Sequence, residues 1–221
     1  VIGVATNRDA WVSGFSKEKV SINMQSMIAF YNQLIGKSDI STDDKKISWT
    51  INLKKDHEKR AIHHFDANAF VISSYRPFNK VVLYYHRPFI ERPGLWKQLF
   101  PTDNYNNNVI AVSGVGQQKP FTPFITNRIS DLQVVDKAQY FPLFWYEENK
   151  NPQASLFDDA ETNHYIRRDG ITDWILKEVR NRFGGTRAIT KEHIFYYVYG
   201  LLHSKQYRER FADDLKKSLP R

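Results

Sequence analysis

The stretch Ser73–Gly94, SSYRPFNKVVLYYHRPFIERPG, combines cations, aromatic side chains and prolines around one β-forming core. Residues 80–85 (KVVLYY) predict a short strand. The cations, set against the single acid Glu91, are Arg76, Lys80, Arg87 and Arg92, and the aromatic residues among them are Tyr75, Phe78, Tyr84, Tyr85 and Phe89. A strand with cationic, aromatic-rich loops is typical of a surface that follows phosphates and reads base edges. The same residues also fit a buried aromatic strand whose arginines are solvated or paired at its ends.

Each proline of this stretch follows an arginine, in the pairs Arg76-Pro77, Arg87-Pro88 and Arg92-Pro93. A proline disfavours helical backbone in the residue before it. We therefore expect the three arginines to lie in extended or turn backbone and not in a helix.

Composition indicates a folded, basic protein. The 221 residues are 41% hydrophobic and 14% aromatic, which is enough for a sizeable core. Lys and Arg exceed Asp and Glu by 32 − 24 = 8, and the pI is near 9.5, which favours a polyanionic partner, nucleic acid before membrane. The absence of Cys excludes disulfides and Cys-ligated zinc and fits a cytoplasmic location. Because the chain starts at Val1, we expect it to be a piece of a longer protein.

The N-terminal segment predicts one long helix over Phe15–Ile35, with Ser16 as N-cap and Gly36 just past its end. Its apolar face consists of Val20, Met24, Met27, Tyr31 and Leu34. Apolar residues then alternate over Ile47–Leu53 and predict a half-buried strand, followed by a short charged helix over Lys54–Ile62.

The middle of the chain is rich in short β-forming runs. Strands are predicted over residues 69–72, 109–112, 121–126, 132–135 and 141–146, with a helical turn over 95–100 and an Asn-rich turn over 103–108. Pro123 favours an edge position for its strand because proline cannot donate to the ladder.

The C-terminal part becomes helical, with N-caps at Thr172, Thr190 and Ser204. Together these patterns predict an α+β fold with an irregular, mostly antiparallel β region. Its segments are an N-terminal part and connecting helix (1–46), a β-rich recognition region (47–146), a polar linker (147–168) and a helical subdomain (169–221).

Residues 109–119, VIAVSGVGQQK, run from a strand into two glycines, as at a dinucleotide or S-adenosylmethionine site. Lys119 stands where the third glycine would be, and Pro120 follows it, so no helix N-terminus is available for a phosphate. We expect a strand–turn–strand loop. Gln117, Gln118 and Lys119 at its end could instead read a DNA groove.

No catalytic or metal constellation is convincing. His63 and His64 are adjacent, so on a strand they would point to opposite faces, and we expect a surface or core-edge role for them. The nucleophile-elbow and phosphate-loop motifs are absent, as is the Asn-Pro-Pro-Tyr tetrad of adenine methyltransferases. We expect this chain not to be a catalyst by itself and to hold no metal.

Three blocks together resemble a known family. They are TNRDAWV (Thr6–Val12), SYRPF…LYY…ERPG (Ser74–Gly94) and ITKEHIFYYVYGLLHSKQYRERFADDLKKSLPR (Ile189–Arg221). They resemble the C-terminal part of type ISP restriction–modification enzymes, and they are similar to the target-recognition domains of single-chain type IIG enzymes. The resemblance spans nearly the whole chain, and the last block is its most specific part.

The resemblance implies a target-recognition domain for double-stranded DNA within a polypeptide that also carries an endonuclease, an ATP-driven translocase and an N6-adenine methyltransferase. S-adenosylmethionine, ATP and Mg would bind those other parts and not this chain. The DNA-binding residues we predict are Arg76, Asn79, Lys80, Arg87, Arg92, Gln117, Gln118, Lys119, Asn127 and Arg128. Two alternatives stay open: a docking domain that packs on the neighbouring methyltransferase or helicase domain without reading bases, and an independent enzyme whose site the sequence does not reveal.

Overall fold

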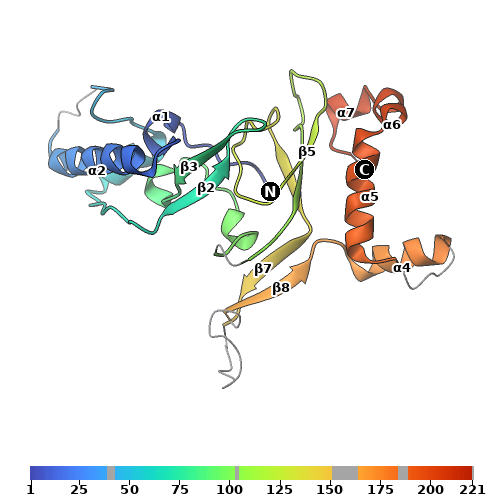
Figure 1. The fold of residues 1–221 in the computed structure, drawn as a ribbon. Coiled ribbons are helices and arrows are strands. Elements are labelled where there is room, and N and C mark those ends of the chain that lie inside the picture. Colours follow the sequence, from blue (N-terminus) through green and yellow to red (C-terminus); the bar gives the residue numbers. More distant parts are fainter. Residues whose placement is uncertain (39–42, 103–104, 151–163, 184–188, 221) are drawn as a thin grey trace. The chain divides into compact units, whose positions relative to one another are not determined.

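The structure, a computed structural model, describes residues 1–38, 43–102, 105–150, 164–183 and 189–220. Most of the helices lie in the N-terminal and C-terminal parts of the chain, most of the strands lie between them, and the sheets are antiparallel, which confirms the predicted α+β class. Two compact units share the chain (Figure 1). The hairpin unit comprises Gly3–Gly94 and Ile129–Val134, and the sheet-and-bundle unit comprises Val1–Ile2, Leu95–Arg128 and Val135–Arg221. None of the helices in the described parts is long and apolar enough to cross a membrane.

The hairpin unit is built on a three-stranded antiparallel sheet in the order β1-β3-β2. Its strands are β1 (Ser13–Gly14), β2 (Phe70–Ser74) and β3 (Lys80–Tyr84). The sequence predicted β2 and β3 at these places. The 3₁₀ turn η1 (Arg87–Phe89) follows β3 and corrects the expectation for Arg87, which begins a helical turn. Proline is tolerated there because the first turn of a helix needs no N–H from it.

Helix α2 (Lys17–Leu34) follows the short α1 (Asp9–Val12) and confirms the long helix predicted from the sequence. The Ser16 hydroxyl accepts a hydrogen bond from the Lys19 amide at 3.2 Å, and Gly36 has the left-handed φ of 81°. All five residues of the predicted apolar face are buried.

Helix α3 (Ile51–Glu58) replaces the strand predicted over Ile47–Leu53, so that prediction was wrong. Thr50 accepts a hydrogen bond from the Leu53 amide and caps the helix. On a helix, residues 51 and 53 lie on different faces, and accordingly Ile51 is 67% exposed while Leu53 is fully buried. The alternating apolar residues of 47–53 therefore do not belong to a strand. They span the segment before the N-cap Thr50 and the first turn of α3.

The sheet-and-bundle unit contains a second antiparallel sheet in the order β5-β4-β6. Strand β4 (Val109–Val112) is buried throughout and lies between β5 (Pro123–Thr126) and β6 (Gln139–Pro142). Pro123 thus occupies an edge strand, as predicted. The helical turn expected over residues 95–100 is the 3₁₀ turn η2 (Trp96–Gln98). Of the Asn-rich turn predicted over 103–108, residues 103–104 lie outside the described residues.

Two strand predictions in this region were wrong in detail. Residues 132–135 form turns, because the Asp131 carboxylate accepts from the Gln133 amide at 2.6 Å and bends the chain. The strand predicted over 141–146 is divided at Leu143, whose amide donates to the Asn108 carbonyl. Beyond the division, β7 (Phe144–Glu148) pairs with β8 (Tyr165–Asp169) in a separate two-stranded sheet. These strands occupy both ends of the predicted linker 147–168, and residues 151–163 of that linker lie outside the described residues.

The helices of the same unit are α4 (Asp173–Arg182), α5 (Lys191–His203), α6 (Lys205–Arg210) and α7 (Asp214–Lys217). Thr172, Thr190 and Ser204 cap the first three, as predicted. The sequence also predicts that the helix beginning after Thr172 ends at Gly184-Gly185, and these two residues lie outside the described residues. Phe195, Leu202 and Leu215 pack with residues of the β5-β4-β6 sheet in one buried cluster. The third predicted helix is broken into α6 and α7, although its apolar spacing still brings Leu215 to the core.

Candidate nucleic-acid interface

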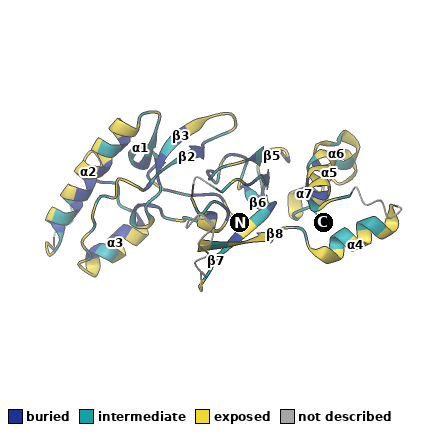
Figure 2. Ribbon diagram, turned by 60° about the horizontal axis from the view of Figure 1, so that its bottom comes forward, coloured by how far each residue is buried: buried dark blue, intermediate teal, exposed yellow. Residues whose placement is uncertain are grey.

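The hairpin tip, Tyr75–Lys80, joins β2 and β3 and carries three of the predicted DNA-binding residues: Arg76, Asn79 and Lys80. The Tyr75 amide donates to the Asn79 carbonyl at 3.0 Å and closes the turn. Arg76 and Phe78 have left-handed φ values of 58° and 72°, which bulky residues rarely adopt. Most of the hairpin tip is exposed, as the burial colours of the ribbon at the end of β3 show (Figure 2).

Arg76 is clamped at the root of the hairpin tip. Its guanidinium donates to the Asp131 carboxylate at 3.2 Å and lies over the Tyr75 ring, 4.7 Å from its centroid. The Tyr75 hydroxyl in turn donates to Asp9 at 3.1 Å, and Thr6 donates to the same carboxylate. The turn is thereby fixed to α1 and to the segment 129–134 of its own unit.

Arg76 differs from Lys80 because its guanidinium forms an ion pair with Asp131 within the unit. Burial raises the pKa of Asp131, while the Gln133 amide and Arg76 act in the opposite direction. The Arg76 side chain is 43% exposed and that of Asp131 only 11%. The carboxylate of Asp131 therefore neutralises part of the positive charge of Arg76. Asn79 and Lys80 are exposed on the same loop.

Arg87 and Arg92 are exposed on the segment that follows β3. The backbone of Arg92 pairs with Ala5: the Ala5 amide donates at 3.0 Å and the Arg92 amide donates back at 2.8 Å. These bonds fix the backbone and leave the guanidinium at the surface.

The glycine loop, residues 113–122, joins β4 and β5, as predicted for a strand–turn–strand loop. A side chain at Gly114 would meet the Lys137 carbonyl oxygen at 2.1 Å, and Gly116 has a φ of 71°. The amides of Gln118 and Lys119 donate to the Asp136 carboxylate, and these bonds lower its pKa. The loop is therefore a rigid turn packed on the segment around residue 136.

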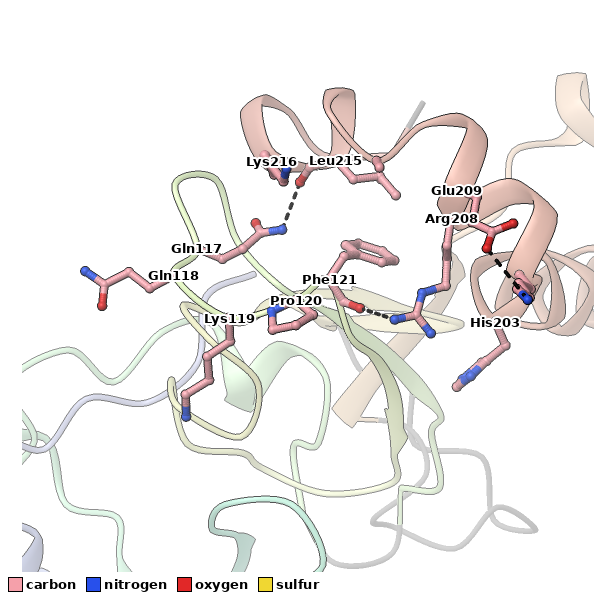
Figure 3. A pocket seen from close by; sticks show the side chains of 12 residues that line it. Gln117, Gln118, Lys119, Pro120, Phe121, His203, Arg208, Glu209, Leu215 and Lys216 are labelled. Atoms are coloured by element: carbon pink, nitrogen blue, oxygen red, sulfur yellow. Dashed lines mark hydrogen bonds and ion pairs between the residues drawn. The ribbon is translucent and has the colours of Figure 1, made fainter.

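Beside the glycine loop lies a pocket of about 640 Å³, lined by the loop and by α6 and α7 (Figure 3). Gln117 donates to the Leu215 carbonyl at 3.0 Å, so its amide is used inside the unit. Gln118 and Lys119 extend away from the helices (Figure 3). Arg208 donates to the Phe121 carbonyl at 2.9 Å.

Asn127 and Arg128 follow β5 and interact with each other. The Arg128 guanidinium donates to the Asn127 side-chain oxygen at 2.9 and 3.1 Å. Asn127 is exposed and Arg128 half-buried. The side-chain NH₂ group of Asn127 can still donate a hydrogen bond to a partner.

The ten predicted residues thus fall into two groups. Five lie in the hairpin unit (Arg76, Asn79, Lys80, Arg87 and Arg92) and five in the sheet-and-bundle unit (Gln117, Gln118, Lys119, Asn127 and Arg128). Phe78 and the pocket-lining Arg208 are not among the residues predicted from the sequence. The Arg-Pro-Phe-Asn turn was the available signal for Phe78.

The histidine pair shows no metal-binding arrangement. His63 lies 3.1 Å from Asp56 and stacks on the Tyr31 ring, with 5.1 Å between ring centroids. Within the described ranges, no three His, Asp or Glu side chains gather as metal ligands.

Comparisons with known proteins identify the family. The model of the type ISP C-terminal specificity domain matches residues 1–221. Two similar solved structures are the ATP-dependent type ISP restriction–modification enzyme LlaBIII bound to DNA (32% identity, TM-score 0.83) and a nuclease-deletion mutant of the type ISP enzyme LlaGI with a DNA substrate mimic (36%, 0.77). A third is the DrdV–DNA complex (29%, 0.84).

The similarity covers the whole chain but a small part of each relative. The comparison with LlaBIII covers 99% of this chain and 14% of that one, and those with LlaGI and DrdV cover all of this chain and 19% and 20% of theirs. None of the curated proteins matches the chain. The match over the entire sequence establishes that the chain belongs to the type ISP C-terminal specificity domain family.

Proposed function

We propose that the chain recognises a short sequence in double-stranded DNA. The observation that carries the proposal is the family match over residues 1–221, together with solved relatives described as bound to DNA. The exposed side chains suit that task, because amides read base edges whereas Lys and Arg contact phosphates or guanine. We assign base reading to Asn79, Gln118 and Asn127, and backbone contact to Lys80, Arg87, Arg92 and Lys119.

Arg76, Gln117 and Arg128 have a different part in this proposal. Each already bonds within its own unit, to Asp131, Leu215 and Asn127 respectively. Contact with DNA would require Gln117 to give up its bond to the carbonyl. Arg76 keeps further donors, since a guanidinium has five.

We also infer that the domain works within a larger enzyme. The chain spans between 14% and 20% of the length of the three solved relatives. A polypeptide of that kind would carry the adenine methyltransferase, translocase and endonuclease activities. S-adenosylmethionine, ATP and Mg would then bind outside this chain, in a cytoplasmic enzyme.

A docking role is the second candidate, favoured by helix α4. No described residue of α4 is buried, and its Trp174 is 69% exposed. An amphipathic helix whose apolar face is only partly covered fits against another protein surface. The two roles are compatible, because the domain could dock through α4 and read DNA with its loops.

The test is selection of bound duplexes from a random-sequence library by the complete polypeptide that carries the chain, over a series of salt concentrations. Asn79→Ala should relax one base position at a cost of roughly 1–3 kcal/mol. Lys80→Ala should weaken all duplexes alike and lower the salt slope by about one. Lys55→Ala, an exposed lysine on α3, is the matched control and should change neither. Selection of no sequence, with unchanged binding in both variants, would favour docking alone.

A further inference from the structure

Phe78 is the most exposed large apolar residue of the described chain, at 93%. Single exposed apolar residues are ordinary on protein surfaces. Phe78 differs because its backbone φ of 72° is also unfavourable for a bulky residue. Such a conformation persists where the surroundings fix it, and these positions cluster at binding sites.

The contacts that fix the backbone of Phe78 are those made by Arg76 and Tyr75 in the same turn. Arg76, two residues earlier, is held by Asp131 and the Tyr75 ring, and the Tyr75 amide closes the turn on Asn79. Pro77 removes further backbone freedom immediately before Phe78. The aromatic ring therefore stands on a rigid support.

Charge around Phe78 favours a nucleic acid as its partner. The hairpin tip carries Arg76 and Lys80 and no acidic residue, and the exposed Asn79 adds an amide. Proteins that deform duplexes insert apolar side chains between base steps while cations hold the adjacent phosphates. Base–aromatic stacking works with any base because each presents a π-face.

We propose that Phe78 is a stacking wedge, whose ring inserts against a base step of the bound duplex while Lys80 contacts a flanking phosphate. This inference rests on the proposed function, since it requires DNA at the hairpin tip. Phe78 would join the proposed DNA-contacting residues. It would recognise how easily a base step deforms, without a hydrogen bond to a base. Flexible pyrimidine–purine steps would be preferred at that position.

The experiment uses the complete polypeptide and its selected duplex, with 2-aminopurine placed at successive positions. Wild-type binding should raise 2-aminopurine fluorescence at one step, where stacking is opened. Phe78→Ala should abolish that rise and weaken binding by roughly tenfold or more. Phe78→Trp keeps a stacking ring and should retain most of the affinity.

Phe15→Ala provides the matched control. Phe15 belongs to the same unit and is 83% exposed, but it lies outside the hairpin tip. This variant should leave both the affinity and the fluorescence unchanged. Because Phe78 and Phe15 are both exposed, neither substitution should alter the thermal unfolding of the protein.

The outcomes separate this inference from the proposed function. If the wild type binds the duplex but no position brightens, or if Phe78→Ala behaves as wild type, the wedge is refuted and DNA recognition stands. Weaker binding by Phe78→Ala with the fluorescence rise intact also refutes the wedge, because the ring would then act without opening the stack. If the wild type binds no duplex at all, the proposed function is refuted, and the stacking role of Phe78, which depends on it, is refuted as well.

Discussion

Replacing Arg76 by alanine should destabilise the hairpin unit by about 2 kcal/mol near neutral pH. The guanidinium donates at 3.2 Å to a carboxylate whose side chain is only 11% exposed. A hydrogen bond to a charged group contributes roughly 1.5–3 kcal/mol, and the 43% exposure of the arginine side chain favours the lower end. Contact with the Tyr75 ring adds about 0.5–1 kcal/mol.

The loss should depend on pH with a definite sign. Burial raises the pKa of Asp131, so the carboxyl group supports the fold best when protonated, below its unfolded value of about 3.9. Its contribution is lost as the pH rises through the folded pKa. Arg76 opposes this rise in pKa, so its removal raises the pKa further. The deficit of Arg76→Ala should therefore be small near pH 4 and grow toward pH 8.

Hydrogen exchange at the amides of Ser74 and Asp131 reports on this region directly, because both link β2 to the segment 129–131. Combining Arg76→Ala with Asp131→Asn completes a double-mutant cycle, and we expect a coupling free energy of about 1–2 kcal/mol. The reasoning is refuted if the two substitutions are additive, or if the cost of Arg76→Ala is the same at both pH values.

Four further predictions concern the sheet-and-bundle unit. Gly114→Ala should destabilise this unit by about 1–3 kcal/mol, since a Cβ would meet a backbone oxygen at 2.1 Å. Gly200→Ala should stabilise α5 by about 0.5–1 kcal/mol, because a Cβ there would meet no atom within 4 Å. Urea unfolding measures the free energy of unfolding of both variants. Thr190→Ala removes the capping box of α5 and should cost about 1 kcal/mol in the same assay, and no change would contradict the role of the cap. The pKa of Asp136 is lowered, so its contribution is present above about pH 4 and lost as the pH falls through the folded value. Acid and Asp136→Asn should both lower the protection factors of the amides of residues 118–119, which compare the observed exchange rate with the intrinsic rate at the same pH; unaltered protection in the variant would refute this.

Local signals in the sequence predicted much of the fold. Caps at Ser16, Thr172 and Thr190 marked helix starts because a side-chain oxygen satisfies an unpaired amide wherever it occurs. The buried strand β4 was predicted from its continuous apolar run. These features depend on a few neighbouring residues, so they can be read without knowledge of the fold.

Tertiary context decided the features that were missed. The cap at Thr50 converted an alternating pattern into α3, and the Asx turn at Asp131 removed a predicted strand. Both signals are local, but each competes with an apolar pattern that predicts a strand, and which of the two prevails depends on the residues that become buried. For the site, the sequence predicted DNA contact for Gln117, but it could not show that the amide of this side chain bonds to the Leu215 carbonyl, 98 positions away in the chain. The exposure of Phe78 follows from a left-handed turn that the sequence analysis did not predict.

The measurement that tests the central claim most directly is hydrogen exchange of the hairpin tip in the complete polypeptide, with and without its selected duplex. We expect slower exchange of the Phe78, Asn79 and Lys80 amides with that duplex, and a weaker effect with a scrambled duplex of equal length. Equal exchange in the free and the DNA-bound protein would contradict the account, because the hairpin tip would then lie outside the DNA interface.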